Sequence, residues 1–249
     1  MPGRENKNRG AAPTGGAEFR GGWRVAAGAA GTFLLFCLGF LIALYAIGVN
    51  DGLYHRLQMR ANVLDGAGID EETLVRLDAA LADCLKGDPA WNAPGGSLLT
   101  ARVFGAEQPA FNERERIHME DCGRLFALLR RAIAAFALAG TALSVLGLRR
   151  LSGRKRRRAV RIAAGLLLAT AGVFIAWAAL DFDSAFNAFH GALFTNDLWL
   201  MDPRTDLLIR ICPESMFRAM GAAIALLGGL WCLAAGIACA RLPMPGQRE

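Results

Sequence analysis

The sequence predicts an all-α protein, a four-helix transmembrane bundle with helical extracytoplasmic loops. The 249 residues are 54% hydrophobic and 20% charged, with a mean hydropathy of +0.31, which is more apolar than a typical soluble domain. The charged residues leave four uncharged runs of 17 to 26 residues, and an α-helix of about 20 residues crosses the core of a bilayer. Four such runs in one chain argue against buried helices of a soluble core.

The uncharged runs place the membrane-spanning helices inside one membrane domain, residues 25–240. The first run is longer than the apolar region of a cleavable signal peptide, and no small-x-small site follows it, so we interpret it as a signal anchor. Residues 1–24 predict a disordered tail, and 241–249 a second short tail. We expect the spans at about 25–49, 128–148, 160–181 and 217–240.

Positive charge sets the predicted orientation, because cytoplasmic loops carry an excess of Lys and Arg. Residues 149–161 hold eight basic side chains and no acidic one. Together with the two tails they carry a net charge of +12, whereas the rest of the chain carries −6. We therefore expect a multi-pass protein of the cell membrane with both termini and loop 149–159 in the cytoplasm, and with loops 50–127 and 182–216 outside.

The charge distribution also argues against two classes of function. Residues 149–161 contain no aromatic side chain to stack on bases, so we expect no nucleic-acid partner; the run orients the protein and contacts anionic lipid. The central stretches of the spans carry no ionisable residue, which ranks a small transporter last.

The first outward loop predicts two helices. Asp70 begins a segment, 70–85, in which apolar residues recur at helical spacing. A Pro- and Gly-rich loop follows at 87–97, and residues 111–126 then run as a helix into the second span. In that helix Glu115, His118 and Cys122 share one face and Asp121 lies beside them.

The second outward loop combines six acidic groups with many aromatic side chains. Asp202 precedes a proline and marks a turn, which leaves open whether Asp202 and Asp206 only shape the loop or belong to a site. The aromatic residues predicted to lie at the membrane interface are Phe182, Phe186, Phe189, Phe194 and Trp199.

These residues carry a resemblance to a bacterial family. Residues 189–199, Phe-His-Gly-Ala-Leu-Phe-Thr-Asn-Asp-Leu-Trp, are similar to F-H-x-x-F-F-x-N-x-x-W, and the segments after them to P-x-x-D-x-L-I and P-x-x-F-F. Residues 115–122 are similar to the family's earlier E-x-x-H-x-x-D-V. The family is that of the lipoprotein intramolecular transacylases. The departures are the apolar exchanges Leu193, Met216 and Cys122.

The resemblance implies an integral membrane acyltransferase without a cofactor. Its partners are membrane lipid and a diacylglyceryl lipoprotein. It implies that an acyl chain moves from the diacylglyceryl group onto the α-amine of the lipoprotein's N-terminal Cys at the outer leaflet. The alternative is a non-catalytic accessory protein that uses the same outward surface for binding in the cell envelope.

Acyl transfer from an ester to an amine needs a base and a group that stabilises the oxyanion. An α-amine has a pKa of about 7.7–8.0, so a neutral His is a suitable base. We take His118 and His190 as the catalytic residues and leave their roles open. Glu115 or Asp121 is expected to orient His118. The supporting or substrate-binding candidates are Glu115, Asp121, Arg130, Asn196, Asp197, Trp199, Asp202 and Asp206.

Several side chains have a second interpretation. Arg130 either snorkels to the headgroup region or holds an ester carbonyl or an anionic headgroup. His55 is expected on the surface. The sequence has no H-x-x-x-H or H-E-x-x-H, so we expect no metal. Whether Cys84, Cys122 and Cys212 form a disulfide stays open.

Overall fold

Four long apolar helices form the body of the protein in the computed structural model, which describes residues 15–88 and 99–242. They cover Gly22–Gly48, Glu113–Leu148, Gly153–Leu180 and Glu214–Arg241, and each is long and apolar enough to cross a membrane. The predicted all-α fold with four spans is confirmed.

Smaller elements lie between the long helices. The π-helical turn η2 interrupts the third span, which α6 and α7 otherwise make up. The elements are, in chain order, α1 (Gly15–Gly48), α2 (Asp51–Arg60), α3 (Val63–Ala67), α4 (Glu71–Lys86), β1 (Thr100–Val103), β2 (Ala106–Pro109), α5 (Glu113–Leu148), α6 (Gly153–Leu167), η2 (Leu168–Gly172), α7 (Val173–Leu180), α8 (Phe182–Leu193), α9 (Leu207–Ile211) and α10 (Glu214–Arg241).

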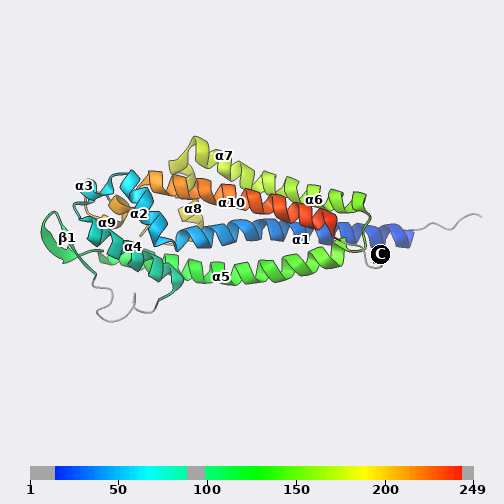
Figure 1. The fold of residues 1–249 in the computed structure, drawn as a ribbon, viewed down its shortest axis with the longest axis horizontal. Coiled ribbons are helices and arrows are strands. Elements are labelled where there is room, and N and C mark those ends of the chain that lie inside the picture. Colours follow the sequence, from blue (N-terminus) through cyan, green and yellow to red (C-terminus); the bar gives the residue numbers. More distant parts are fainter. Residues whose placement is uncertain (1–14, 89–98, 243–249) are drawn as a thin grey trace, which may run out of the picture.

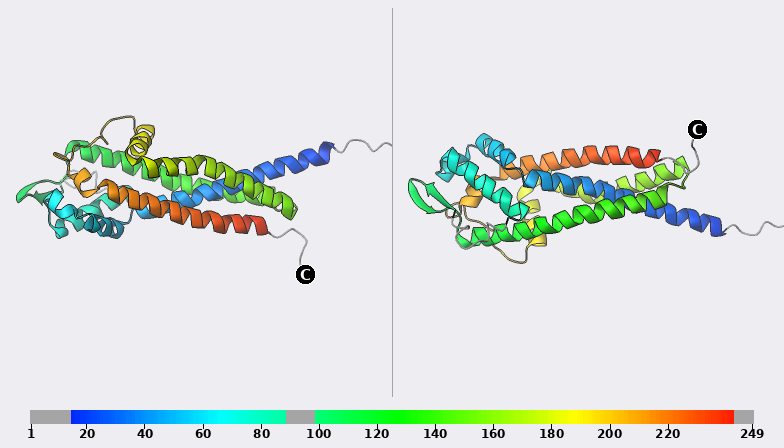
Figure 2. Two further views of the ribbon diagram at one scale, coloured as in Figure 1. Left: turned by 90° about the horizontal axis from the view of Figure 1, so that it is seen from above. Right: turned by 60° about the horizontal axis from the view of Figure 1, so that its bottom comes forward.

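Helix α1 lies at the centre of the bundle and packs against α5, α6 and α10 (Figures 1 and 2). Its contact with α5 is very close, because Gly28 on α1 faces Gly147 on α5, and a side chain at Gly147 would overlap the α1 backbone. Small residues at such a crossing let two membrane helices approach and gain van der Waals contact.

The bundle has two different ends. α1 begins and α10 ends at one end, where the connection between α5 and α6 also lies, whereas α2, α3, α4, α9 and the strands gather at the opposite end (Figure 1). The basic loop and the two outward loops are thereby separated by the length of the bundle. The grouping puts loop 149–159 and the two loops predicted to be outward at opposite ends of the bundle, and which end faces the cytoplasm stays a prediction.

The start of the first helix differs from the prediction, whereas the helix predicted at 111–126 runs into the second span as expected. The first helix begins at Gly15, so residues 15–24 are helical rather than part of a disordered tail; residues 1–14 and 243–249 lie outside the described residues. Adding residues to a helix that is already nucleated costs little free energy, because each new residue also adds a backbone hydrogen bond. Helix α5 begins at Glu113 and has 36 residues, about 54 Å at about 1.5 Å per residue. It therefore projects well beyond a bilayer core of about 30 Å.

The outward segments form a compact cap with its own apolar core. Helix α4 matches the helix predicted at 70–85, with the Asp70 side chain accepting a hydrogen bond from the Thr73 N–H at 2.8 Å. Its buried face places Leu74, Leu77 and Leu81 in the core that also contains Ile211 of α9. The cap thus joins the first outward loop to the second.

A β-hairpin that the sequence did not predict belongs to this cap. Strands β1 and β2 pair antiparallel with Val103 opposite Ala106. The two turn residues, Phe104 and Gly105, have φ of 48° and 84°. Positive φ at both positions is the geometry of a two-residue type I′ turn. The strands have four residues each, too few for a clear alternating pattern in the sequence.

Asp78 in the cap is expected to make stability depend on pH. It is 1% exposed, Gln58 Nε2 donates to its Oδ1 at 2.9 Å, and Asp78 Oδ2 and Gln58 Oε1 have no partner among the described residues. Burial raises the pKa of Asp78 to about 7. The folded state therefore holds a proton that the unfolded chain releases near pH 3.9, and stability falls as pH rises from about 4 to 7.

We predict that Asp78→Asn raises the thermal midpoint at pH 8 and leaves it unchanged near pH 4; an equal shift at both values would contradict this.

Candidate active site

The start of α5 is fixed by a capping box. The Asn112 side chain accepts a hydrogen bond from the Glu115 N–H at 3.0 Å, and the Asn112 N–H donates to Glu115 Oε2 at 2.7 Å. This pairing satisfies two N–H groups at the helix N-terminus. It also sets where the following turn, which carries His118, begins.

Two buried carboxylates tie this helix start to the second outward loop. Glu115 is 1% exposed, and its Oε1 accepts a hydrogen bond from the Leu208 N–H at 2.6 Å. Asp206 accepts from Asn112 Nδ2 at 2.9 Å and from the Asp202 N–H at 2.8 Å. We call the set Asn112, Glu115, Asp206 and the Leu208 N–H the carboxylate clamp. Because both Glu115 oxygens bind backbone N–H groups, Glu115 holds the loop and does not orient His118.

His118 lies one turn after Glu115 and is 8% exposed. Its ring lies 6.2 Å from the His190 ring and 5.0 Å from the Phe194 ring, measured between centroids. Its Nε2 is 3.6 Å from Cys122 Sγ, and its Nδ1 is buried without a hydrogen-bond partner. The structure thus brings together the two histidines, 72 residues apart in the chain, that the sequence singled out.

His190 sits near the end of α8 inside an aromatic enclosure. Its ring centroid lies 3.9 Å from Phe186, 5.1 Å from Trp199 and 5.7 Å from Phe194. Its Nδ1 is 2.8 Å from the Phe186 carbonyl oxygen. An acceptor at this position places the proton on Nδ1 and leaves a lone pair on Nε2. Burial among the rings lowers the pKa of His190, so the imidazole is neutral at pH 7.

Asn196 and Asp121 form a second bridge between α5 and the loop. Asn196 Nδ2 donates to Asp121 Oδ2 at 2.9 Å, and Arg124 donates to Asp121 Oδ1 at 2.6 Å. The amide of Asn196 has a second N–H. Asp121 binds these two partners rather than the His118 imidazole, so it positions Asn196.

Four candidates take structural positions. Arg130 donates to the Leu85 carbonyl at 3.1 Å, at the end of α4, and twelve residues of helix separate it from His118 by about 18 Å. Asp202 forms a fork with Arg204, whose guanidinium lowers the pKa of Asp202 to about 2. Asp197 accepts a hydrogen bond from Arg114 through its backbone oxygen. The contacts of Asp202, together with those of Asp206 in the clamp, favour the interpretation that these two carboxylates shape the loop.

Sequence reasoning missed Asn112 and, although it took Trp199 as a candidate site residue, it missed the packing of the aromatic side chains around His190. The signal for Asn112 is present, since Asn112 and Glu115 have the spacing of a capping box. Phe186, Phe194 and Trp199 were expected at the membrane interface, and they surround His190. Their packing partners follow from the tertiary fold and not from local sequence.

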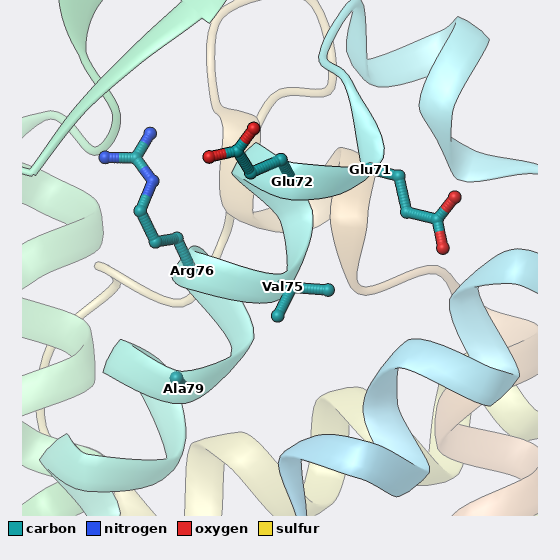
Figure 3. Close-up of a pocket in the computed structure, with 5 residues that line it drawn as sticks. All are labelled: Glu71, Glu72, Val75, Arg76 and Ala79. Carbon is teal, nitrogen blue, oxygen red and sulfur yellow. The ribbon is translucent and has the colours of Figure 1, made fainter.

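Cysteines and cavities add no other site of this kind. All six cysteines lie in the described residues and are free thiols. Within residues 15–88 and 99–242, no group of three His, Cys, Asp or Glu side chains is arranged to hold a metal ion. A depression of about 560 Å³ on α4 is lined by Glu71, Glu72, Val75, Arg76 and Ala79 (Figure 3). One helix supplies all five residues, so no second element brings a reactive group to it.

The fold and the site define a polytopic membrane protein in which a buried histidine, His118 of α5, lies close to a half-buried one, His190 of α8. Residues 29–217 match the family described as lipoprotein intramolecular transacylase Lit. This match covers most of the chain, and the chain belongs to that family. The protein is therefore a multi-pass membrane protein of an acyltransferase family.

Solved structures show the same fold. The membrane-integral lipoprotein intramolecular transacylase Lit from Bacillus cereus is similar with a TM-score of 0.64 and 20% identity, over 89% of this chain and 93% of that one. A variant of that protein with one histidine replaced by alanine is similar with a TM-score of 0.64 and 18% identity. The similarity covers 91% of this chain and 94% of that one. No curated protein matches the chain. At this identity the structures support the fold alone.

The capping box predicts a test of how the site is held. Asn112→Ala removes the cap and one of the hydrogen bonds to Asp206, which keeps those from the Asp202 N–H and the Thr205 hydroxyl, so we expect a loss of about 2 kcal/mol in the free energy of unfolding. Ser152→Ala is the matched control, because Ser152 precedes α6 but its side chain makes no capping hydrogen bond. Denaturant unfolding measures both. Equal losses in the two variants would contradict the assignment.

Proposed function

We propose that this chain moves an acyl chain from the diacylglyceryl group of a lipoprotein onto the α-amine of its N-terminal Cys. The supporting observation is the meeting of His118 and His190, from α5 and α8, at 6.2 Å between ring centroids. Membership of the transacylase family supplies the substrate class. The reaction needs no energy input, since an ester becomes a more stable amide.

The neutral imidazole of His190 acts as the general base. Its Nδ1 is held by the Phe186 carbonyl, so Nε2 accepts a proton from the substrate α-amine as the nitrogen attacks the ester carbonyl. The new C–N bond forms a tetrahedral intermediate. When the C–O bond breaks, the same proton passes from Nε2 to the departing glyceryl oxygen. The imidazole returns to its starting state.

His118 stabilises the oxyanion. The His118 side chain is buried, and its Nδ1 has no hydrogen-bond partner in the described part of the chain. An N–H at a buried position without a partner is ready to donate to a charge that develops only in the transition state. The second N–H of the Asn196 amide, fixed by Asp121, adds a donor.

The proposed orientation puts this site at the outer leaflet. The net charge of +12 on the segments at the other end of the bundle directs that end, with both termini, to the cytoplasm. The Phe189 and Leu193 side chains of α8 stay exposed near the histidines. They offer apolar surface to the acyl chains of a lipid-anchored substrate.

Histidine variants test the proposed reaction. The protein is expressed in a bacterium that lacks lipoprotein N-acylation, and the N-terminal peptide of a lipoprotein is analysed by fragment-ion mass spectrometry. Fragmentation is needed because an intramolecular transfer leaves the peptide mass unchanged. We expect N-acylated peptide with the wild type and a rate at least about 100-fold lower for His118→Ala and His190→Ala.

The third histidine supplies the control. His55 lies on α2, 3.2 Å from Glu71, so His55→Ala should keep the wild-type rate. A free α-amine on the lipoprotein with the wild-type protein would favour an accessory role over catalysis. Full activity in both site variants would show that the chemistry lies elsewhere.

The rate should depend on pH through two deprotonations. The substrate amine has a pKa of about 7.7–8.0, and the pKa of His190 is lowered by burial from its ordinary value of about 6.5. The logarithm of the single-turnover rate is expected to rise with pH with a slope of two below both pKa values and of one between them. In His190→Ala the slope should never exceed one. A slope of two in that variant would exclude His190 as the base.

A further inference from the structure

A second site lies at the end of the bundle away from the histidines. A groove of about 620 Å³ is lined by residues of α1 and α6, and its volume lies within the range of ligand pockets, about 300–1,000 Å³. The side chains that the argument uses are Val25 and Ala26 of α1, and Lys155, Arg158, Ile162 and Leu166 of α6.

The α6 wall of the groove changes from basic to apolar along its length. Lys155, Arg158, Ile162 and Leu166 are spaced by three or four residues and share one helix face. The two cations lie in the first turns of α6, and the two aliphatic side chains follow toward the middle of the span. A phospholipid has the same order, with a phosphate at the surface and an acyl chain below it.

The α1 wall provides the room for a chain. Gly22, Ala26 and Ala30 line the groove and are exposed. Residues with so little side chain leave a furrow beside the bulkier Ile162 and Leu166. The furrow is apolar, so an alkyl chain in it loses little on leaving the surrounding lipid and gains van der Waals contact.

Within the described side chains, no carboxylate pairs with the positive charge at the mouth of the groove. Neither Lys155 nor Arg158 takes part in an ion pair within the described residues, and residues 149–161 contain no acid. The adjacent Arg156 buries its Nε and Nη1 without a hydrogen-bond partner there. Buried donors and unpaired cations at a membrane surface call for an anionic group.

We infer that this groove binds an anionic phospholipid, with the phosphate at Lys155 and Arg158 and one acyl chain along Ile162 and Leu166. With the proposed orientation, the lipid belongs to the cytoplasmic leaflet. The inference does not depend on the proposed acyl transfer, because the two sites lie at opposite ends of the bundle. The lipid anchors α6, the least buried of the four spans, against α1.

The test measures lipid binding to the full chain in detergent by native mass spectrometry, with phosphatidylglycerol and phosphatidylcholine titrated separately. The wild type should bind phosphatidylglycerol more tightly. Each basic side chain near a lipid surface contributes about fivefold, so Lys155→Gln with Arg158→Gln should weaken phosphatidylglycerol binding by about 25-fold and leave phosphatidylcholine unchanged.

The matched control is Arg154→Gln with Arg157→Gln, which removes the same charge from the same helix but not from the groove. This control variant should bind phosphatidylglycerol more tightly than phosphatidylcholine, as the wild type does. An equal loss in both double variants would show that only the total charge matters and would overturn the site, as would a wild type without preference for phosphatidylglycerol.

A third variant tests the furrow. Ala26→Phe keeps every charge and fills the exposed α1 wall, so it should weaken phosphatidylglycerol binding at least fivefold. The thermal midpoint of each variant without added lipid shows whether it is folded. Wild-type binding by a folded Ala26→Phe protein would place the acyl chain elsewhere and overturn the assignment to this groove.

Discussion

The buried hydrogen bond from the Leu208 N–H to Glu115 is the contact on which the site depends. It joins residues 93 positions apart and fixes the loop that follows α8 against the start of α5. Breaking it would leave Oε1 of a carboxylate at 1% exposure without a donor, while Oε2 keeps the Asn112 N–H, and an unsatisfied buried acceptor costs about 1–3 kcal/mol. The clamp therefore holds His118, one turn later on α5, in one position relative to the loop.

The aromatic side chains around His190 set the tautomer and the protonation state of its imidazole. Phe186 supplies a ring at 3.9 Å from the His190 ring and a carbonyl that fixes the imidazole tautomer. Burial keeps His190 neutral, as a base for an amine must be. The packing of Phe186 against His190 thus sets both the orientation and the protonation state of the imidazole.

Hydropathy predicted the four spans because length and apolarity are local properties of a sequence. The two histidines were singled out by motifs, but their contact was not deducible from spacing, because it depends on how the loop folds back. Glu115 or Asp121 was expected to orient His118, whereas Glu115 accepts hydrogen bonds from the Asn112 and Leu208 N–H groups. Arg130 looked functional at the outer end of a span, and only α4, packed beside it, reveals its role.

The most direct test is the single-turnover rate of acyl transfer by Glu115→Gln. This change keeps one oxygen acceptor and the size of the side chain but removes the second acceptor of the clamp. We predict at least a tenfold fall in rate, together with faster hydrogen exchange at the Leu208 amide and unchanged protection in α1 and α10. A wild-type rate in a variant whose Leu208 amide exchanges faster would contradict the central claim that the clamp positions the histidines.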